Sequence, residues 1–275
     1  MAQQTRIRLK DGIEIPQIGF GVWQIENAAA PKAVQAAIEA GYRSIDTAAI
    51  YGNEEGVGAG IRAAGIPRKE LFITTKLWND RHGAKAAPKA FEESLKRLGL
   101  DYVDLYLIHW PTPRANLYVE TWRALQDIRN SGRARSVGVS NFTVPHLERL
   151  LGETGIVPAI NQIELHPRFQ QAAQRAFHAR HGIVTESWSP LGRGRVMKDP
   201  LIAGIAAGHG RTPAQVTLRW HIQSGLVAIP KSVTPSRIAE NLDVFGFELT
   251  EDDMAKIATL DNTRGRVGPD PDLFT

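Results

Sequence analysis

Four ionisable side chains of different kinds stand where short apolar runs of the sequence end. Asp46, Lys76 and His109 each lie at or near the end of such a run, and Tyr51 follows Asp46 by five residues. A phenol can give up a proton, a nearby ammonium can change its acidity, and an imidazole can hold a substrate oxygen. This set of residue types predicts acid–base chemistry, provided that the fold brings the ends of the runs together.

Each of the four side chains also has an ordinary structural interpretation. Asp46 could cap a turn, His109 could be a hydrogen-bonded core histidine, and Lys76 could extend its amine to solvent. Tyr51 could be an aromatic residue of a surface loop. The set as a whole favours a functional site, because burying several titratable groups together is costly unless they pair.

Other kinds of site fit the sequence less well, and we predict no metal site. Lys76 would repel a cation held between Asp46 and His109, and no second histidine or glutamate completes a ligand set. A G-x-S-x-G motif, typical of serine hydrolases, is absent. The chain has no cysteine, which excludes disulfides, thiolate zinc sites and cysteine nucleophiles.

Apolar runs rich in β-forming residues recur eight times, with amphipathic segments such as 31–41, 88–100 and 172–182 between them. These three segments end in or next to glycine, a common C-terminal residue of helices. Continuous apolar strands that alternate with helices predict a parallel sheet covered by helices. Eight such units favour a closed (β/α)8 TIM barrel of the α/β class over an open doubly wound sheet, for which a G-x-G-x-x-G fingerprint is missing. The predicted strands are 17–23, 43–48, 71–78, 103–110, 134–141, 159–166, 183–190 and 226–233.

The two ends of the chain differ from this repeat. Apolar residues alternate on both sides of Asp11-Gly12, which predicts an N-terminal β-hairpin, placed at the bottom of the barrel. Residues 261–275 are rich in glycine and proline and are interpreted as a short C-terminal surface tail. We predict a single domain over residues 1–275, since no linker or low-complexity tract divides the chain.

Charge and hydropathy limit the partners of the protein. The net charge is +4, but the 33 basic and 29 acidic residues are interspersed, whereas nucleic-acid binding usually needs a clustered basic face. No run approaches the roughly 18 apolar residues of a membrane span, and the N-terminus has no apolar core of a signal peptide. We therefore expect a soluble, cytoplasmic protein with neither nucleic acid nor membrane as a partner.

Seven segments, taken together, resemble the signature segments of the aldo-keto reductase superfamily. They occur in order over nearly the whole chain, from the N-terminal hairpin to about residue 260, and their joint occurrence is highly specific. Within the family the chain looks closest to bacterial reductases of the 2,5-diketo-D-gluconate reductase type. The segments are DTAAIYGNE, TTKLW, DLYLIHWP, GVSNF, NQIELHP, SWSPLG and KSVTPSRIAENLDVF.

The resemblance implies a barrel enzyme that reduces aldehydes and ketones with NADPH bound extended across the barrel mouth. The catalytic residues of the family carry over without a gap onto Asp46, Tyr51, Lys76 and His109. Tyr51 would donate the proton, with its pKa lowered by Lys76, and Asp46 would hold that lysine charged and in place. His109 would orient the substrate oxygen and stabilise the developing alkoxide.

The resemblance also implies residues along the whole length of the cofactor. The run from 231 to 241 also has a plain interpretation as the solvated start of a helix, with Thr234 as N-cap. The implied residues are Trp188, Ser140, Asn141 and Gln162 at the nicotinamide, Ser189 and Leu191 over the pyrophosphate, Lys231, Ser232 and Arg237 at the 2′-phosphate, Glu240 and Asn241 at the adenine, and Gly21, Val22 and Val233 elsewhere along the cofactor.

Three tryptophans are implied to form the substrate pocket with His109, namely Trp23, Trp78 and Trp110. Two departures from the family pattern change these expectations. Residues 193–195 are Arg-Gly-Arg where some relatives have an acidic residue that latches over the cofactor, so cofactor exchange is expected to be less gated. The short tail is expected to leave a more open pocket.

We therefore favour a monomeric carbonyl reductase whose partner is a small carbonyl compound such as a keto-sugar or an α-dicarbonyl. Two alternatives stay open at this point. One is an aldolase that forms a Schiff base with Lys76. The other is a non-catalytic, cofactor-binding regulatory subunit similar to the potassium-channel β subunits.

Overall fold

Eight parallel strands form a ring in which each strand pairs with its neighbour in chain order. In the computed structural model, which describes residues 4–275, Ile18 bridges Ala228 in parallel and so joins the first strand of the ring to the last. The amide of Gly19 donates to the carbonyl oxygen of Ala228 across this seam at 2.9 Å. The predicted (β/α)8 fold is confirmed. The strands are β3 (Phe20–Gly21), β4 (Ser44–Asp46), β5 (Phe72–Leu77), β6 (Val103–Ile108), β7 (Ala134–Ser140), β8 (Ile160–Glu164), β9 (Val184–Trp188) and β10 (Val227–Ala228).

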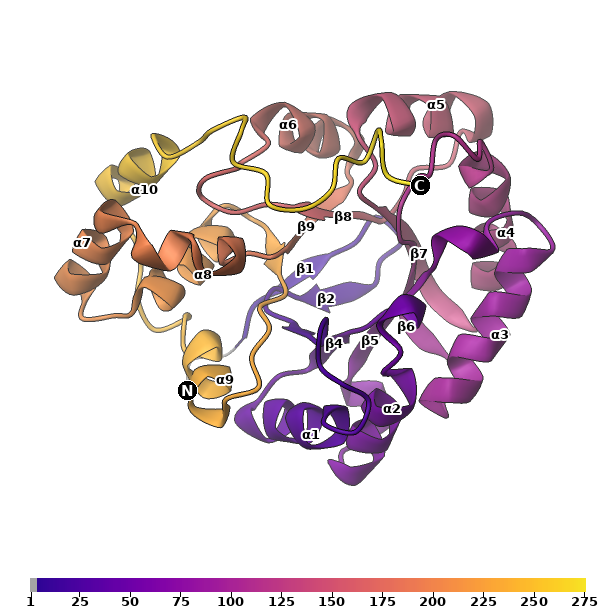
Figure 1. Cartoon of the computed structure of the whole chain (residues 1–275), viewed down its shortest axis with the longest axis horizontal. Coiled ribbons are helices and arrows are strands. Elements are labelled where there is room, and N and C mark those ends of the chain that lie inside the picture. Colours follow the sequence, from indigo (N-terminus) through magenta and orange to yellow (C-terminus); the bar gives the residue numbers. More distant parts are fainter. Residues whose placement is uncertain (1–3) are drawn as a thin grey trace.

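Helices surround the ring and cover the outer face of its strands (Figure 1). The three predicted glycine ends are confirmed, because Gly41, Gly99 and Gly182 follow α1, α3 and α6 with positive φ. This left-handed conformation costs glycine little, and it lets the chain turn from each helix toward the next strand. The helices are α1 (Ala30–Ala40), α2 (Glu54–Ala63), α3 (Ala86–Leu98), α4 (Tyr118–Asn130), α5 (Val144–Thr154), α6 (Ala172–His181), α7 (Pro200–His209), α8 (Pro213–Gln223), α9 (Pro235–Leu242) and α10 (Glu251–Ala258).

A two-stranded hairpin closes the end of the barrel at which the strands begin. It consists of β1 (Arg6–Arg8) and β2 (Glu14–Pro16), which pair antiparallel around a turn that contains Gly12. Leu9 and Ile15 pack in one cluster with residues from the start of the barrel strands, such as Phe72 and Val227. The hairpin therefore lies at the bottom of the barrel, as predicted, and leaves the opposite end free for a site.

Because all eight strands are parallel, their C-terminal ends meet at the same end of the ring. Asp46, Lys76, Gln162 and Trp188 all lie at or near such ends. Among residues 4–275, no helix is long and apolar enough to cross a membrane.

Candidate active site

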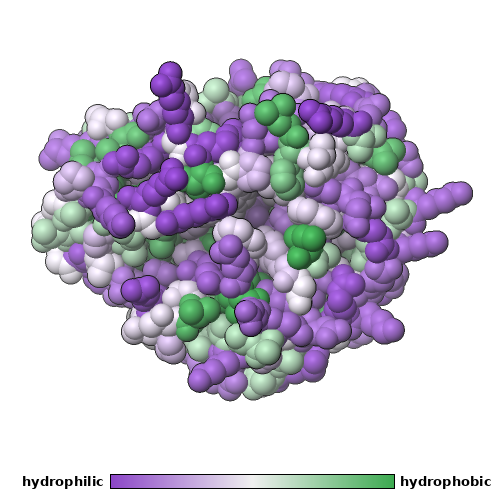
Figure 2. Space-filling model, viewed as in Figure 1, coloured by the Kyte–Doolittle hydropathy of each residue, from purple (hydrophilic) through white to green (hydrophobic). Residues whose placement is uncertain are grey.

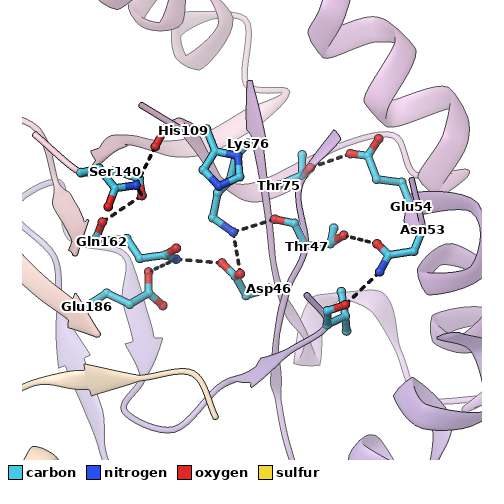
Figure 3. Close-up of polar contacts among 12 residues, drawn as sticks. Asp46, Thr47, Asn53, Glu54, Thr75, Lys76, His109, Ser140, Gln162 and Glu186 are labelled. Atoms are coloured by element: carbon cyan, nitrogen blue, oxygen red, sulfur yellow. Dashed lines mark hydrogen bonds and ion pairs between the residues drawn. The ribbon is translucent and has the colours of Figure 1, made fainter. Parts of the chain in front are cut away.

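A buried ion pair lies at the base of the barrel mouth. The Nζ of Lys76, on β5, donates to Asp46 Oδ1, on β4, at 2.5 Å and to the carbonyl oxygen of Thr47 at 2.8 Å. Figure 3 shows both bonds converging on the amine. The lysine side chain is fully buried and the aspartate side chain is 3 % exposed. Two partners in a buried setting fix the ammonium in one place.

Tyr51 and His109 lie on the solvent side of this pair. Tyr51 ends a single 3-10 turn (Ala49–Tyr51) after β4, and its ring centroid lies 5.2 Å from Lys76 Nζ. The ring of His109, which follows β6, packs edge-on against Tyr51, with 5.6 Å between centroids, and against Trp78, with 5.2 Å. The structure thus brings together all four side chains that the sequence analysis singled out.

The protonation states of these groups follow from burial and from the Lys76 charge. Burial raises the pKa of Tyr51 above its ordinary value, and Lys76 opposes this increase only in part. The predicted lowering of the Tyr51 pKa is therefore wrong for this structure: the lysine acts in the expected direction, but burial and the charge of Asp46 outweigh it. Burial and Lys76 together lower the pKa of His109 well below its usual range, so the imidazole is neutral.

Lys76 remains charged despite its burial. Burial alone would lower the pKa of the amine, but Asp46 and Tyr51 outweigh burial and raise it above the ordinary value. A Schiff base forms only from a neutral amine, so this pairing disfavours the aldolase alternative.

A cavity of about 1200 Å³ extends across the barrel mouth from the four groups. Tyr51 and His109 line it directly, whereas Lys76 lies behind them. Trp23, Trp78 and Trp110 line the cavity too, as the resemblance implied. In the space-filling view this face of the molecule is hollowed near its centre, with a few apolar residues standing among polar ones (Figure 2).

Most residues implied to hold the cofactor line the same cavity, and three do not. Val22 is buried, and its amide donates to Asp46 O. The hydroxyl of Ser140 is buried and donates to Gln162 O, while Val233 is 57 % exposed. Direct contact of these three with a cofactor stays a prediction. The residues that line the cavity are Gly21, Asn141, Gln162, Trp188, Ser189, Leu191, Lys231, Ser232, Arg237, Glu240 and Asn241.

One end of the cavity carries exposed cations. Lys231 and Arg237 form no ion pair with any residue of the 4–275 range. Thr234 is the N-cap residue of α9, as expected, but the Ser232 hydroxyl accepts from the Thr234 amide at 3.1 Å. Two free cations beside the N-terminus of a helix can bind an anion.

The other end is built around Asn141, whose φ of 63° is unusual for a residue other than glycine. Its Oδ1 accepts from the indole N–H of Trp188 at 2.8 Å, and its Nδ2 donates to His109 O and to Ser140 Oγ at 3.0 Å each. Asn141 therefore fixes the plane of Trp188 and links it to the backbone of His109.

A cation–aromatic contact spans the cavity near Trp23. The guanidinium of Arg193 lies 4.9 Å from the centroid of the Trp23 ring, and both residues line the cavity. Arg193 belongs to the Arg-Gly-Arg segment that replaces the acidic latch of some relatives. The contact joins the loop after β9 to the loop after β3. The expected weaker gating of cofactor exchange stays a prediction.

The C-terminal segment crosses the barrel mouth above β8 and β9 (Figure 1). Glu164, the last residue of β8, accepts from the amides of Val267 at 2.5 Å and Gly268 at 2.9 Å. Phe274 lines the cavity and lies 4.5 Å, between centroids, from Trp110. Most of the segment is exposed, in agreement with the predicted surface tail, and Phe274 packs against Trp78 and Trp110 at the edge of the cavity. The expected more open pocket stays a prediction.

The sequence analysis did not assign a role to four residues near the site, namely Glu164, Glu186, Arg193 and Phe274. A carboxyl group inside an apolar strand run was the only available signal for Glu164 and Glu186. No pattern in the sequence marks Phe274 as a cavity residue, and Arg193 stands out only as a departure from the acidic latch of some relatives. Both residues reach the site through loops.

Comparison with known proteins places the chain among reductases. The model of the "Aldo/keto reductase family" matches residues 17–262. An aldo-keto reductase of Mycolicibacterium smegmatis is 56 % identical over 98 % of both chains. Methylglyoxal reductase DkgA of Escherichia coli K12 is 54 % identical over 100 % of this chain and 99 % of its own.

Solved structures agree with this result. The apo form of Gox0644 superimposes with a TM-score of 0.95 at 55 % identity, covering 98 % of each chain. A mutant of Gox0644, crystallised in complex with NADPH, gives a TM-score of 0.96 at 53 % identity over 99 % of each chain. With the four buried groups at the mouth of a (β/α)8 barrel, these matches establish that the chain belongs to the aldo/keto reductase family.

Proposed function

We propose that this NADPH-dependent aldo-keto reductase acts on α-dicarbonyls and keto-sugars, with Tyr51 as proton donor. One observation carries the proposal. A phenol and a neutral imidazole face the same cavity as two unpaired cations, so a carbonyl group and a phosphorylated cofactor have places in one continuous space.

The cavity residues fit an extended dinucleotide. Lys231 and Arg237 would hold the 2′-phosphate, with Ser232 beside them. The amide of Gln162 and the fixed face of Trp188 suit the carboxamide and the ring of a nicotinamide. When bound, NADPH supplies the hydride that reduces the carbonyl carbon.

The chain's own residues handle the proton and the oxygen. The raised pKa of Tyr51 keeps the phenol protonated at neutral pH, so it is ready to donate as negative charge develops on the substrate oxygen. Lys76 then stabilises the phenolate that remains. Neutral His109 has one N–H to donate to the same oxygen, and no charge that would have to be desolvated.

The wall of the pocket supports a substrate with a second oxygen. The indole N–H groups of Trp78 and Trp110 donate to no acceptor within residues 4–275, although both residues line the cavity. A dicarbonyl or a keto-sugar offers these donors an acceptor next to the reacting carbonyl, and a simple aldehyde does not. One relative is named methylglyoxal reductase, and methylglyoxal is an α-dicarbonyl.

NADPH consumption across matched substrates tests the proposal. We expect kcat/KM for methylglyoxal to exceed that for propanal, and Trp110→Phe to reduce this ratio by about 5–10-fold, since one hydrogen bond contributes about 1–1.5 kcal/mol. The variant keeps the apolar wall of the pocket. Because wild type and variant are compared on the same two substrates, the intrinsic reactivity of methylglyoxal cancels between the two ratios. Equal ratios in wild type and variant would contradict the proposed substrate class. No NADPH consumption with any carbonyl would contradict the reductase itself.

The proposal extends to the state of the protein in the cell. We infer that it acts as a monomer in the cytoplasm, with no nucleic acid as a partner. The groups assigned to the reaction all lie within one chain, which supports the monomer. Light scattering on the purified protein tests the oligomeric state, and a stable dimer would contradict it.

A further inference from the structure

A second carboxyl group lies inside the barrel and has no part in the mechanism above. Glu186 stands in the middle of β9, is 1 % exposed, and is in register with Gln162 of β8 and Val227 of β10. Figure 3 shows it on the same side of the barrel as Asp46, with Gln162 between the two carboxyl groups. It does not line the cavity.

Glu186 and Asp46 bind the same nitrogen. Gln162 Nε2 donates to Asp46 Oδ2 and to Glu186 Oε2, each at 2.9 Å. A side-chain amide has two N–H donors, so both are used. The amide oxygen accepts from no residue in the 4–275 range, and Gln162 lines the cavity. The oxygen is therefore the end left for a ligand.

Asp46 alone would hold this amide less firmly. Its other oxygen binds Lys76, and the terminal torsion of a glutamine is broad, so one donor bond leaves the amide free to tilt. A second acceptor on β9 removes this freedom. The flipped amide is disfavoured by Asp46, because it would turn the Gln162 oxygen toward the carboxylate that pairs with Lys76.

We propose that Glu186 is a positioning residue, which fixes the Gln162 amide so that its oxygen accepts from the carboxamide N–H₂ of the nicotinamide and thereby selects the ring face that meets the substrate. This inference rests on the proposed binding of the nicotinamide next to Gln162. Glu186 touches neither cofactor nor substrate and acts through Gln162.

The protonation state of Glu186 suits this role. Burial, reinforced by the charge of Asp46, raises the pKa of Glu186 to about 8, so the group is mostly neutral near pH 7. A neutral carboxyl still accepts through its carbonyl oxygen, and it adds no second negative charge beside the ion pair of Asp46 and Lys76. The role therefore depends on an acceptor and not on a charge.

Variants at position 186 can separate the hydrogen-bond acceptor from the negative charge. Glu186→Gln keeps an acceptor oxygen and a similar shape, whereas Glu186→Leu keeps volume and removes the acceptor. Ser187→Ala is the matched control on the same strand, because the Ser187 hydroxyl is buried and has no hydrogen-bond partner in the described part of the chain.

Two measurements distinguish positioning from a purely structural role. Tryptophan fluorescence gives the Kd of NADPH without turnover. NADPH that carries deuterium at either the pro-R or the pro-S hydrogen of nicotinamide C4 shows which face of the ring delivers its label to the product. For Glu186→Leu we expect about tenfold weaker binding, in proportion to one hydrogen bond, and label transfer from both faces. Glu186→Gln and Ser187→Ala should keep the affinity within about twofold and should transfer from one face only.

Several outcomes would overturn the inference. One is a Glu186→Leu variant that binds NADPH with wild-type affinity and transfers label from one face only. Another is a Glu186→Gln variant that loses as much affinity and face selection as Glu186→Leu, which would mean that the charge and not the acceptor matters. If Glu186→Leu does not fold, the double variant Glu186→Leu with Gln162→Leu removes both hydrogen-bond partners. This double variant should match Gln162→Leu alone in NADPH affinity and face selection. Weaker face selection in the double variant than in Gln162→Leu would contradict the proposal. Absence of label transfer in the wild type would instead contradict the proposed function.

Discussion

Lys76 has the most completely buried side chain of the proposed catalytic residues, and its charge is balanced by a single carboxylate. Breaking a buried pair by removing one partner typically costs about 3–5 kcal/mol, whereas removing both partners can be nearly neutral. The pair thus links the proposed catalysis to stability, and the two effects can be separated by comparing the removal of one partner with the removal of both.

Replacing Tyr51 with phenylalanine removes the proposed proton donor and little else. The ring can still pack on His109 and beneath the cofactor cavity. We expect kcat for carbonyl reduction to fall by about 10²–10⁴, the typical contribution of a general acid, with the Kd of NADPH unchanged. Steady-state kinetics and fluorescence titration measure the two quantities. Retention of most of the activity would mean that another group donates the proton.

Lys76→Met leaves the Asp46 carboxylate buried with only Gln162 as a side-chain donor. We expect carbonyl reduction to collapse and the free energy of unfolding to fall by about 3–5 kcal/mol. Adding Asp46→Leu should restore much of the stability but none of the activity. Urea denaturation and NADPH consumption check both parts, and near-normal reduction by Lys76→Met would show that the lysine does not act on Tyr51.

At this scale the sequence predicts which side chains meet but not how they titrate. The positions of Asp46, Lys76 and His109 follow from the rule that parallel strands end together, so their proximity was predictable. The direction of the Tyr51 pKa was not, because it depends on the balance between burial and two opposite charges. The role of Glu186 was not predictable for a similar reason, because only the register of β8 and β9 places it against Gln162.

At the scale of elements, β8 positions two different parts of the site. Side chains two residues apart point to the same side of a strand, so Gln162 and Glu164 project together at the mouth. Gln162 donates to Asp46, and Glu164 accepts from the C-terminal segment. One strand therefore sets the relative placement of the proposed nicotinamide site and of the C-terminal segment that carries Phe274.

Glu164→Ala should release the C-terminal segment from β8. The carboxylate accepts two amide bonds, and hydrogen bonds to charged groups contribute about 1.5–3 kcal/mol each. We expect faster proteolysis within residues 262–275 and at least a several-fold higher KM for the carbonyl substrate, since Phe274 would leave the tryptophan wall. The Kd of NADPH should change much less. Unchanged proteolysis and KM would show that other contacts hold the segment.

Helices α2 and α3 pack so closely at Gly58 that no side chain fits there. A Cβ added there would lie 1.9 Å from the carbonyl oxygen of Leu98, and backbone cannot yield easily. We expect Gly58→Ala to destabilise the protein by about 1–3 kcal/mol or more. Gly152→Ala in α5 is the control, because a Cβ there meets nothing within 4 Å, and it should stabilise by about 0.5–1 kcal/mol. Thermal and urea unfolding of both variants measure these changes in stability. Equal changes in Gly58→Ala and Gly152→Ala would contradict the close packing at Gly58.

At the scale of the whole molecule, the cavity separates the chemistry from the cations that would select the cofactor. Lys231 follows β10 and Arg237 lies in α9, and these elements carry none of Asp46, Tyr51, Lys76 and His109. Changes at this end should therefore alter cofactor choice and leave the reacting groups intact.

The double change Lys231→Gly with Arg237→His should narrow the preference for NADPH over NADH. Each charge-assisted contact to a phosphate contributes at least about 1.5 kcal/mol, so the loss of two such contacts should raise the Kd of NADPH by about a hundredfold or more, and that of NADH much less. Arg195→His is the control, an exposed cation that does not line the cavity. Equal losses for both cofactors would mean that these residues do not bind the 2′-phosphate.

The barrel itself was predictable because its signal repeats eight times along the chain. The role of residues 262–275 was not, because it depends on contacts with segments about a hundred residues away, such as that of Glu164 with Val267. Local composition marked this stretch as irregular, which is correct, but irregular backbone can still be held firmly when a buried carboxylate binds its amides.

The position of Phe274 has a practical consequence for handling the protein. An affinity tag or reporter fused after Thr275 would begin one residue from a ring that packs on Trp110, and its first residues would compete for space at the entrance. A fusion before the hairpin would start at the opposite end of the barrel, far from the entrance. Recombinant protein for kinetics should therefore carry its tag at the N-terminus, and differences between preparations tagged at opposite ends would report on the entrance and not on the chemistry.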